Sequence, residues 1–185
     1  LVAPVNDGAS VVFKVVDKVE DIVLDDSVTY KSPKEFLFPQ VEQIMVFTKE
    51  GGLEVKNNAP KTIIFGVRPC DLEALKVMTA VFTKGKYTDT YFAEKLNNTV
   101  LIGLGCKSEK PGCFCAQRGI NKSSSNACDI FLSNAGDSFT VEVITDKGEG
   151  IVSKYNFEEA AATETFGAES NNSELLEINA DEMTV

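Results

Sequence analysis

The segment at residues 61–82 constrains the fold more than any other part of the chain. Residues 62–67 ("TIIFGV") form an unbroken apolar run, which is the pattern of a parallel strand buried on both faces. Apolar residues then recur at helical spacing, at Leu72, Leu75, Met78, Val81 and Phe82. A strand, a short loop and a helix in this order predict an α/β domain with a mainly parallel central sheet.

Other runs of β-forming residues predict the rest of that sheet. "TVLIGLG" at residues 99–105 is a second buried strand, and "LVAPV" and "VVFKVV" flank the turn sequence "NDGAS" as a hairpin at the start. "DIFLS" and "SFTVEVIT" predict a further strand with a hairpin partner. We therefore predict an α/β fold with a mainly parallel central sheet, flanking helices and a β-hairpin, formed by residues 1–155.

Two short helical pieces are predicted between the first hairpin and residue 61. "SPKEF" has a capping-box pattern with Ser32 as N-cap, and "PQVEQIMVF" follows with Pro39 at its start. The apolar cluster at residues 36–38 ("FLF") is expected in the core.

Charge is distributed unevenly along the chain. The formal net charge is −10, and eight of the acidic residues follow Lys154, where no basic residue occurs. Residues 156–185 therefore read as an acidic tail or linker. An acidic chain is a poor partner for nucleic acid, and no run of about 20 apolar residues predicts a membrane span. With no signal-peptide pattern at the start, the expected location is the cytoplasm.

Histidine is absent from the chain. This removes the usual general base, the usual nitrogen ligand of zinc and any Ser-His or Cys-His nucleophile. Any chemistry must then use Cys, Asp, Glu, Lys, Tyr or a bound cofactor, and no independent catalysis is expected.

Four cysteines are predicted to meet at one edge of the sheet. Cys70 follows the first buried strand at a helix start where Asp71 is a candidate N-cap, and Cys106 follows the second strand. Cys113 and Cys115 lie in the turn "KPGCFCAQRG". Because ligands collect at the carboxyl ends of strands in open α/β sheets, these thiols are expected to converge. A helix N-terminus can lower the pKa of a thiol such as Cys70, or help it hold a metal.

Several kinds of site use clustered cysteines. Disulfides are disfavoured by an odd count of five and by the strain of bridging one intervening residue. A redox pair would more usually be spaced C-x-x-C, structural zinc usually uses two such knuckles, and iron–sulfur clusters take four thiolates.

The only two arginines, Arg68 and Arg118, lie within three residues of these cysteines. Their side chains are expected to point towards the thiols, where guanidinium donors would stabilise an anionic cluster. The remaining cysteine, Cys128, is expected to be a small, semi-buried residue.

Five segments together resemble a known family. These are "SPKEFLFPQVE", "GVRPCDLEAL", "YFAEKLNNTVLIGLGC", "GCFCAQRG" and "CDIFLSNAGDSFTVEV". In this order they resemble the N-terminal part of the iron–sulfur β subunits of sulfhydrogenases and of the A subunit of anaerobic sulfite reductases.

The resemblance implies that Cys70, Cys106, Cys113 and Cys115 hold an iron–sulfur cluster, of the 4Fe-4S type, which an aerobic preparation can lose. It also implies an electron-transfer module of a multi-subunit oxidoreductase, with flavin-containing and catalytic subunits as partners. By this resemblance, we expect residues 156–185 to lead towards an absent ferredoxin-like segment, the dicluster segment of that family. The alternative is a non-redox docking domain with structural zinc or free thiols.

Overall fold

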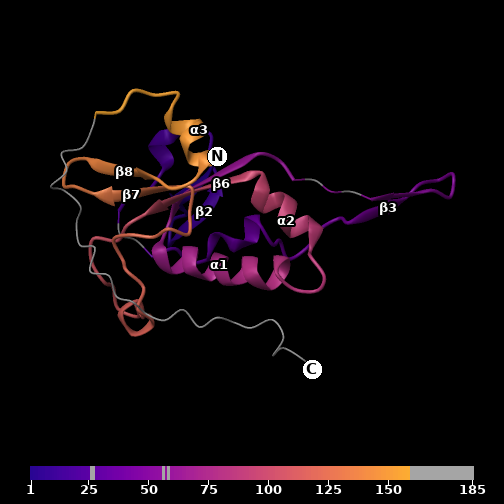
Figure 1. Cartoon of the computed structure of the whole chain (residues 1–185), viewed down its shortest axis with the longest axis horizontal. Coiled ribbons are helices and arrows are strands. Elements are labelled where there is room, and N and C mark those ends of the chain that lie inside the picture. The colour runs from indigo at the N-terminus through magenta and orange to yellow at the C-terminus, as the bar shows by residue number, and fades with distance from the viewer. Residues whose placement is uncertain (26–27, 56, 58, 159–185) are drawn as a thin grey trace.

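A six-stranded sheet organises the computed structural model of the chain, which describes residues 1–25, 28–55, 57 and 59–158 (Figure 1). The strand order is β2-β1-β5-β6-β7-β8. The strands are β1 (Val2–Asn6), β2 (Val11–Val15), β5 (Thr62–Val67), β6 (Thr99–Leu104), β7 (Ile130–Asn134) and β8 (Phe139–Val143). A separate two-stranded sheet pairs β3 (Met45–Phe47) with β4 (Leu53–Val55).

The centre of the large sheet is parallel, as predicted. β5 pairs in parallel with β1 and β6, and β6 pairs in parallel with β7. The edge strands β2 and β8 pair antiparallel with β1 and β7, so both predicted hairpins are confirmed. This arrangement brings the carboxyl ends of β5 and β6 to the same edge of the sheet.

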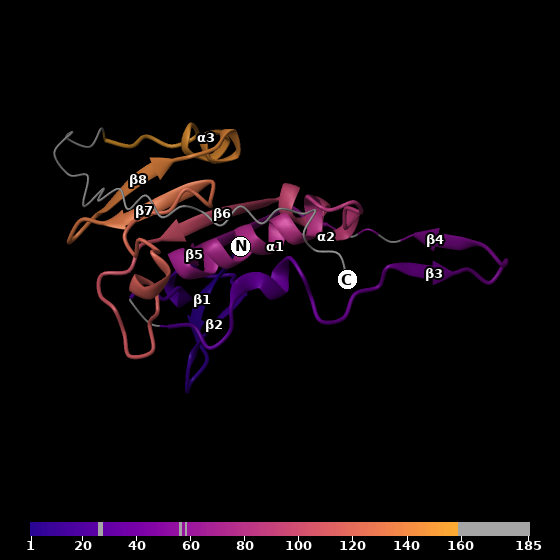
Figure 2. The same cartoon turned by 60° about the horizontal axis from the view of Figure 1, so that its bottom comes forward.

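Helices cover the sheet and complete the core. The α-helices are α1 (Pro69–Thr83), α2 (Thr90–Asn97) and α3 (Asp146–Val152), and the short 3₁₀ helices are η1 (Val19–Asp21), η2 (Pro33–Phe36) and η3 (Ala116–Arg118). Figures 1 and 2 show α1 and α2 on one side of the sheet, and α3 beside β8. One core cluster joins α1, α2 and the strands through buried apolar side chains, including Leu72, Phe92 and Phe131.

A bulge in β5 shapes the backbone just before the first cysteine. The register of the β5–β6 pairing shifts between Phe65 and Val67, and Gly66 between them has a φ of 80°. An added Cβ at Gly66 would lie 3.1 Å from the Pro4 ring of β1. Since Pro4 has no N–H to donate to β5, the bulge occurs where the ladder to β1 is interrupted.

Two local predictions between residues 32 and 71 are wrong. Residues 39–47 form no helix; the chain bends at residues 40 and 41 and ends in β3, because Met45 and Phe47 pair across the small sheet with Val55 and Leu53. Asp71 does not cap α1 either. Arg68 is the N-cap residue and Asp71 lies inside the first turn.

The segment "SPKEF" forms only the 3₁₀ helix η2, with Ser32 as N-cap but no capping hydrogen bond from its side chain. The expected core cluster at residues 36–38 is confirmed in part. Leu37 is buried and Phe36 packs against the core, whereas Phe38 is 47% exposed.

We call residues 45–55 the arm. Figures 1 and 2 both show β3 and β4 projecting from the body of the molecule beyond α2. The connecting turn is closed by the Thr48 N–H donating to the Gly52 carbonyl at 2.9 Å. At its tip Gly51 takes a φ of 79°, which favours glycine.

Of the predicted acidic tail at residues 156–185, the part from position 159 onward lies outside the described residues. Among the helices that the structure describes, none is long and apolar enough to cross a membrane.

Candidate cysteine site

Cys70 is the second residue of α1, directly past the end of β5. Burial raises the pKa of its thiol to about 12. The prediction of a lowered pKa is therefore wrong for the free thiol. The backbone N–H of Asp71 does act in the predicted direction, but the loss of solvation at this half-buried position outweighs it.

Three of the four predicted cysteines interact electrostatically. Negative charge on Cys115 and on Cys106 raises the pKa of Cys70 further. These thiols come from the end of β5, the end of β6 and the turn after it, whereas the fourth, Cys113, is not among the charges that act on Cys70. Within the described residues, however, no three Cys, Asp or Glu side chains lie close enough to share a metal ion.

Cys113 and Cys115 lie in a turn that leads into η3. Cys113 is exposed and Cys115 is half-buried, and the Cys113 sulfur accepts from the Lys110 backbone N–H at 3.2 Å. The Cys115 carbonyl accepts from the Ile120 N–H at 2.9 Å, which folds the turn back on itself. Phe114 is 53% exposed, so the cysteine turn presents an aromatic ring at the surface.

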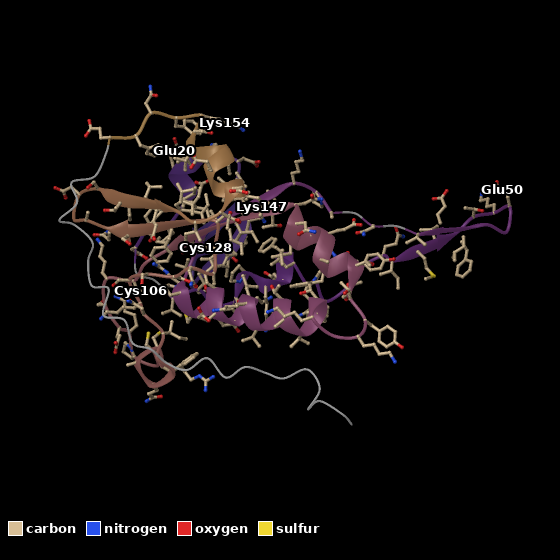
Figure 3. The ribbon with its side chains drawn as sticks, in the orientation of Figure 1. Glu20, Glu50, Cys106, Cys128, Lys147 and Lys154 are labelled. Atoms are coloured by element: carbon tan, nitrogen blue, oxygen red, sulfur yellow. The ribbon has the colours of Figure 1, made fainter. Side chains whose placement is uncertain are left out.

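A backbone hydrogen bond sets the position of Cys106. Its N–H donates to the Lys122 carbonyl at 2.8 Å, while the neighbouring Gly105 N–H donates to the Leu132 carbonyl at 2.9 Å. Residues 106–122 thus form a loop that the Cys106–Lys122 hydrogen bond closes just past the end of β6. Cys106 is half-buried and lies where this loop closes. Figure 3 labels Cys106 at the end of the molecule that lies away from Glu50.

Arg68 is an inward-facing residue rather than a surface one. Its side chain is only 7% exposed, and Nη1 donates to the Gly105 carbonyl at 3.3 Å, next to Cys106. Nη2 donates to the Asp25 carbonyl. A buried guanidinium with these partners joins the end of β5 to the end of β6, which fixes the backbone that carries two of the cysteines.

Arg118 lies on the surface and lines a cavity beside the start of α1. The cavity holds about 460 Å³, and Pro69, Glu73 and Ser124 are among the other residues around it. Arg118 thereby reaches the region of Cys70, although no contact with a thiol is seen among its described interactions.

Asp71 has a partner that no sequence pattern indicates. Ser32 donates a side-chain hydrogen bond to Asp71, which links the N-cap of η2 to the first turn of α1. Burial raises the pKa of Asp71, and the Ser32 bond opposes this shift. Ser32, directly before Pro33, has only the local pattern of a helix N-cap. That pattern gives no indication that Ser32 bonds to Asp71, which lies 39 positions further along the chain.

All five cysteines lie within the described residues and carry free thiols. Cys128 is 5% exposed, so it is more deeply buried than the predicted semi-buried position. Burial raises the pKa of its thiol to about 12, against an opposing hydrogen bond from the Gly103 backbone.

We expect Cys128 to resist alkylation in the metal-free chain. With a pKa of about 12 against 9.0 for an unperturbed thiol, its thiolate fraction at pH 8 is about a thousandfold lower than that of a free cysteine. Iodoacetamide labelling followed by peptide mass spectrometry should therefore find exposed Cys113 modified well before Cys128. Raising the pH from about 8 to 9 should speed Cys128 labelling about tenfold. Labelling of Cys128 as fast as a short cysteine peptide would contradict this assignment.

Comparison with known proteins gives one relative. The chain is 27% identical over 149 residues to the protein named Sulfhydrogenase 2 subunit beta of Pyrococcus furiosus, and the match covers 80% of this chain and 43% of the relative. The chain therefore spans less than half the length of that protein. No family model matches the chain, and no solved structure matches it. Taken with the cysteine edge of the sheet, this similarity supports a relationship to sulfhydrogenase β subunits.

Proposed function

We propose that the chain is an electron-transfer module of a multi-subunit oxidoreductase of the hydrogenase or sulfite reductase type, and that it binds an iron–sulfur cluster. The observation that carries the proposal is the position of Cys70 and Cys106, which lie within three residues of the carboxyl ends of the paired parallel strands β5 and β6, at the edge of the sheet where ligands of α/β folds collect. The similarity to a sulfhydrogenase subunit supports the redox role.

Cys70, Cys106, Cys113 and Cys115 would hold the cluster, which is of the 4Fe-4S type in this proposal. Four thiolates are the ligand set that such clusters take, so the residues fit the group in kind and number. When bound, the cluster supplies one-electron transfer. Arg68 would hold the Cys70 and Cys106 backbones in register through its bond to Gly105, and its buried positive charge would favour an anionic group nearby.

The proposal includes flavin-containing and catalytic subunits as partners, because a chain that only carries electrons needs a donor and an acceptor. The exposed Cys113 and Phe114 give such a partner access to the site. Five free thiols are typical of a reducing compartment, which supports a cytoplasmic location.

A non-redox docking domain with zinc or free thiols is the second candidate. Its form with free thiols is supported by the geometry, because no three Cys, Asp or Glu side chains of the described residues lie close enough to share a metal ion.

The two functions are separated by replacing Cys113 and Cys115 with Ser in the assembled complex. Electron transfer predicts that electron flow to the distal acceptor falls at least about tenfold while the complex stays intact, since loss of a relay slows transfer without removing the docking surface. Native mass spectrometry gives the assembly state, and reduction of a dye acceptor gives the flow. Loss of assembly instead would favour the docking function, and no change in either would contradict both.

A further inference from the structure

One face of the arm is apolar and uncovered. The β3–β4 register pairs Met45 with Val55 and Phe47 with Leu53, and residues paired or alternating in this way share a face. Their exposed fractions are 43% for Met45, 66% for Val55, 80% for Phe47 and 54% for Leu53. A two-stranded ribbon with an exposed apolar face is marginally stable in water, so the arm is built to be covered.

Three contacts from α2 and its C-cap hold the chain on both sides of the arm. Before the arm, the Tyr91 hydroxyl donates to the Ile44 carbonyl at 3.0 Å, and the buried Lys95 ammonium pairs with Glu42. After the arm, the Asn98 side chain donates to the Ala59 carbonyl at 2.6 Å. The body of the protein therefore sets the direction in which the arm projects, which a loosely attached loop would not require.

The apolar surface is large enough to be one side of a protein interface. Val41 is 90% exposed and Ile44 is 46% exposed at the base of the arm. With the four residues of the apolar face, this leaves roughly 600 Å² uncovered at about 150 Å² per large side chain. Monomers rarely expose a larger apolar patch, and about 800 Å² per partner is typical of a stable complex.

A cavity extends this surface at the base of the arm. It holds about 780 Å³ and is lined by Phe36, Pro39, Val41 and Val55, with Lys95 and Glu42 among its polar residues. Because Val55 belongs to both, the arm face and the cavity form one continuous surface that a protruding side chain of a partner can enter.

We propose that the arm is the docking element by which this chain binds a different subunit of its complex, one that presents an apolar surface. The patch area fits such an interface, and the relative is named as the β subunit of an assembly. Figure 3 places Glu50, at the tip of the arm, and Cys106 at opposite ends of the molecule. The arm thus anchors the chain while the cysteine end stays open to redox partners. This inference rests on the multi-subunit part of the proposed function and not on the cluster.

Site-specific photo-crosslinking in cells that make the native complex tests the proposal. A photoreactive phenylalanine analogue replaces Phe47 on the apolar face, and in a matched chain it replaces Glu54, which the register places on the opposite face. Mass spectrometry then identifies the attached peptide. We expect position 47 to attach to a different polypeptide of the complex at least fivefold more efficiently than position 54.

A paired substitution gives a second readout. The variant Phe47→Ser with Leu53→Ser should retain at least tenfold less partner in the purified complex, whereas Glu54→Ser should retain it fully. Iron content per chain should be the same in the double variant, in Glu54→Ser and in the unchanged protein. Attachment of position 47 to a second copy of this chain or to lipid would overturn the proposal. So would equal yields at positions 47 and 54, or full retention by the double variant. If the chain contains no iron and position 47 still attaches to another subunit, the result would support docking through the arm and contradict the proposed cluster binding.

Discussion

Replacing Cys106 with Ala is expected to abolish cluster binding. In the proposed site Cys106 supplies one of four thiolates, and its position is fixed by the hydrogen bond to Lys122 and by the Arg68 contact with Gly105. No other described cysteine can take its place, because Cys128 is buried. Visible absorption at about 400 nm and bound iron should both fall by about 90% or more in anaerobically purified protein.

The matched control is Cys128→Ala, which removes a thiol outside the proposed ligand set. It should retain its colour and iron with a small loss of stability, since Cys128 packs in the core. Cys70→Ala, Cys113→Ala and Cys115→Ala should behave as Cys106→Ala. Full iron content in Cys106→Ala, or loss of iron in Cys128→Ala alone, would show that the ligand set is wrong.

Replacing Asp129 with Ala is expected to lower the free energy of unfolding by about 3 kcal/mol. This carboxylate is 5% exposed and accepts from the Leu101 backbone N–H at 2.8 Å and from the Thr145 hydroxyl. It therefore connects β6, β7 and the start of α3. Lys147 lies 3.7 Å away, but its side chain is 43% exposed, so that ion pair adds little.

Urea unfolding followed by circular dichroism measures the loss. Asp129→Asn keeps an acceptor for one of the two donors and should lose less than Asp129→Ala. Asp137→Ala, in an exposed turn, should change stability by less than about 0.5 kcal/mol. A loss below about 1 kcal/mol for Asp129→Ala would mean that water satisfies the Leu101 N–H, contrary to the burial described.

The parallel sheet was predictable because its signal is local. The apolar runs of β5 and β6 are each long enough to be buried strands, and the turn sequences between β1 and β2 and between β7 and β8 mark hairpins. Placing Cys70 and Cys106 after two such strands was then enough to bring them to one edge. The interaction of Cys70 with Cys106 and Cys115 agrees with that step.

Features that depend on distant partners could not be predicted in this way. Val41, Ile44 and Met45 have helical spacing, yet pairing of Met45 and Phe47 with the second leg of the arm makes β3 a strand. The sequence predicts an Arg68 side chain that points towards the thiols. In the structure this side chain turns inward and donates to the carbonyls of Gly105 and Asp25, which only the folded chain brings together. For Cys70, the position at a helix start suggested a lowered pKa. Burial of the thiol by the tertiary structure raises its pKa instead.

The central claim is that this chain binds an iron–sulfur cluster, and the most direct measurement is made on the full chain purified with oxygen excluded throughout. Iron and acid-labile sulfide are quantified per chain, and an electron paramagnetic resonance spectrum is recorded after reduction with dithionite. The proposal predicts about four iron and four sulfide per chain and a paramagnetic signal that appears on reduction. A colourless chain that contains zinc or no metal, and that stays colourless after anaerobic reconstitution with iron and sulfide, would contradict it.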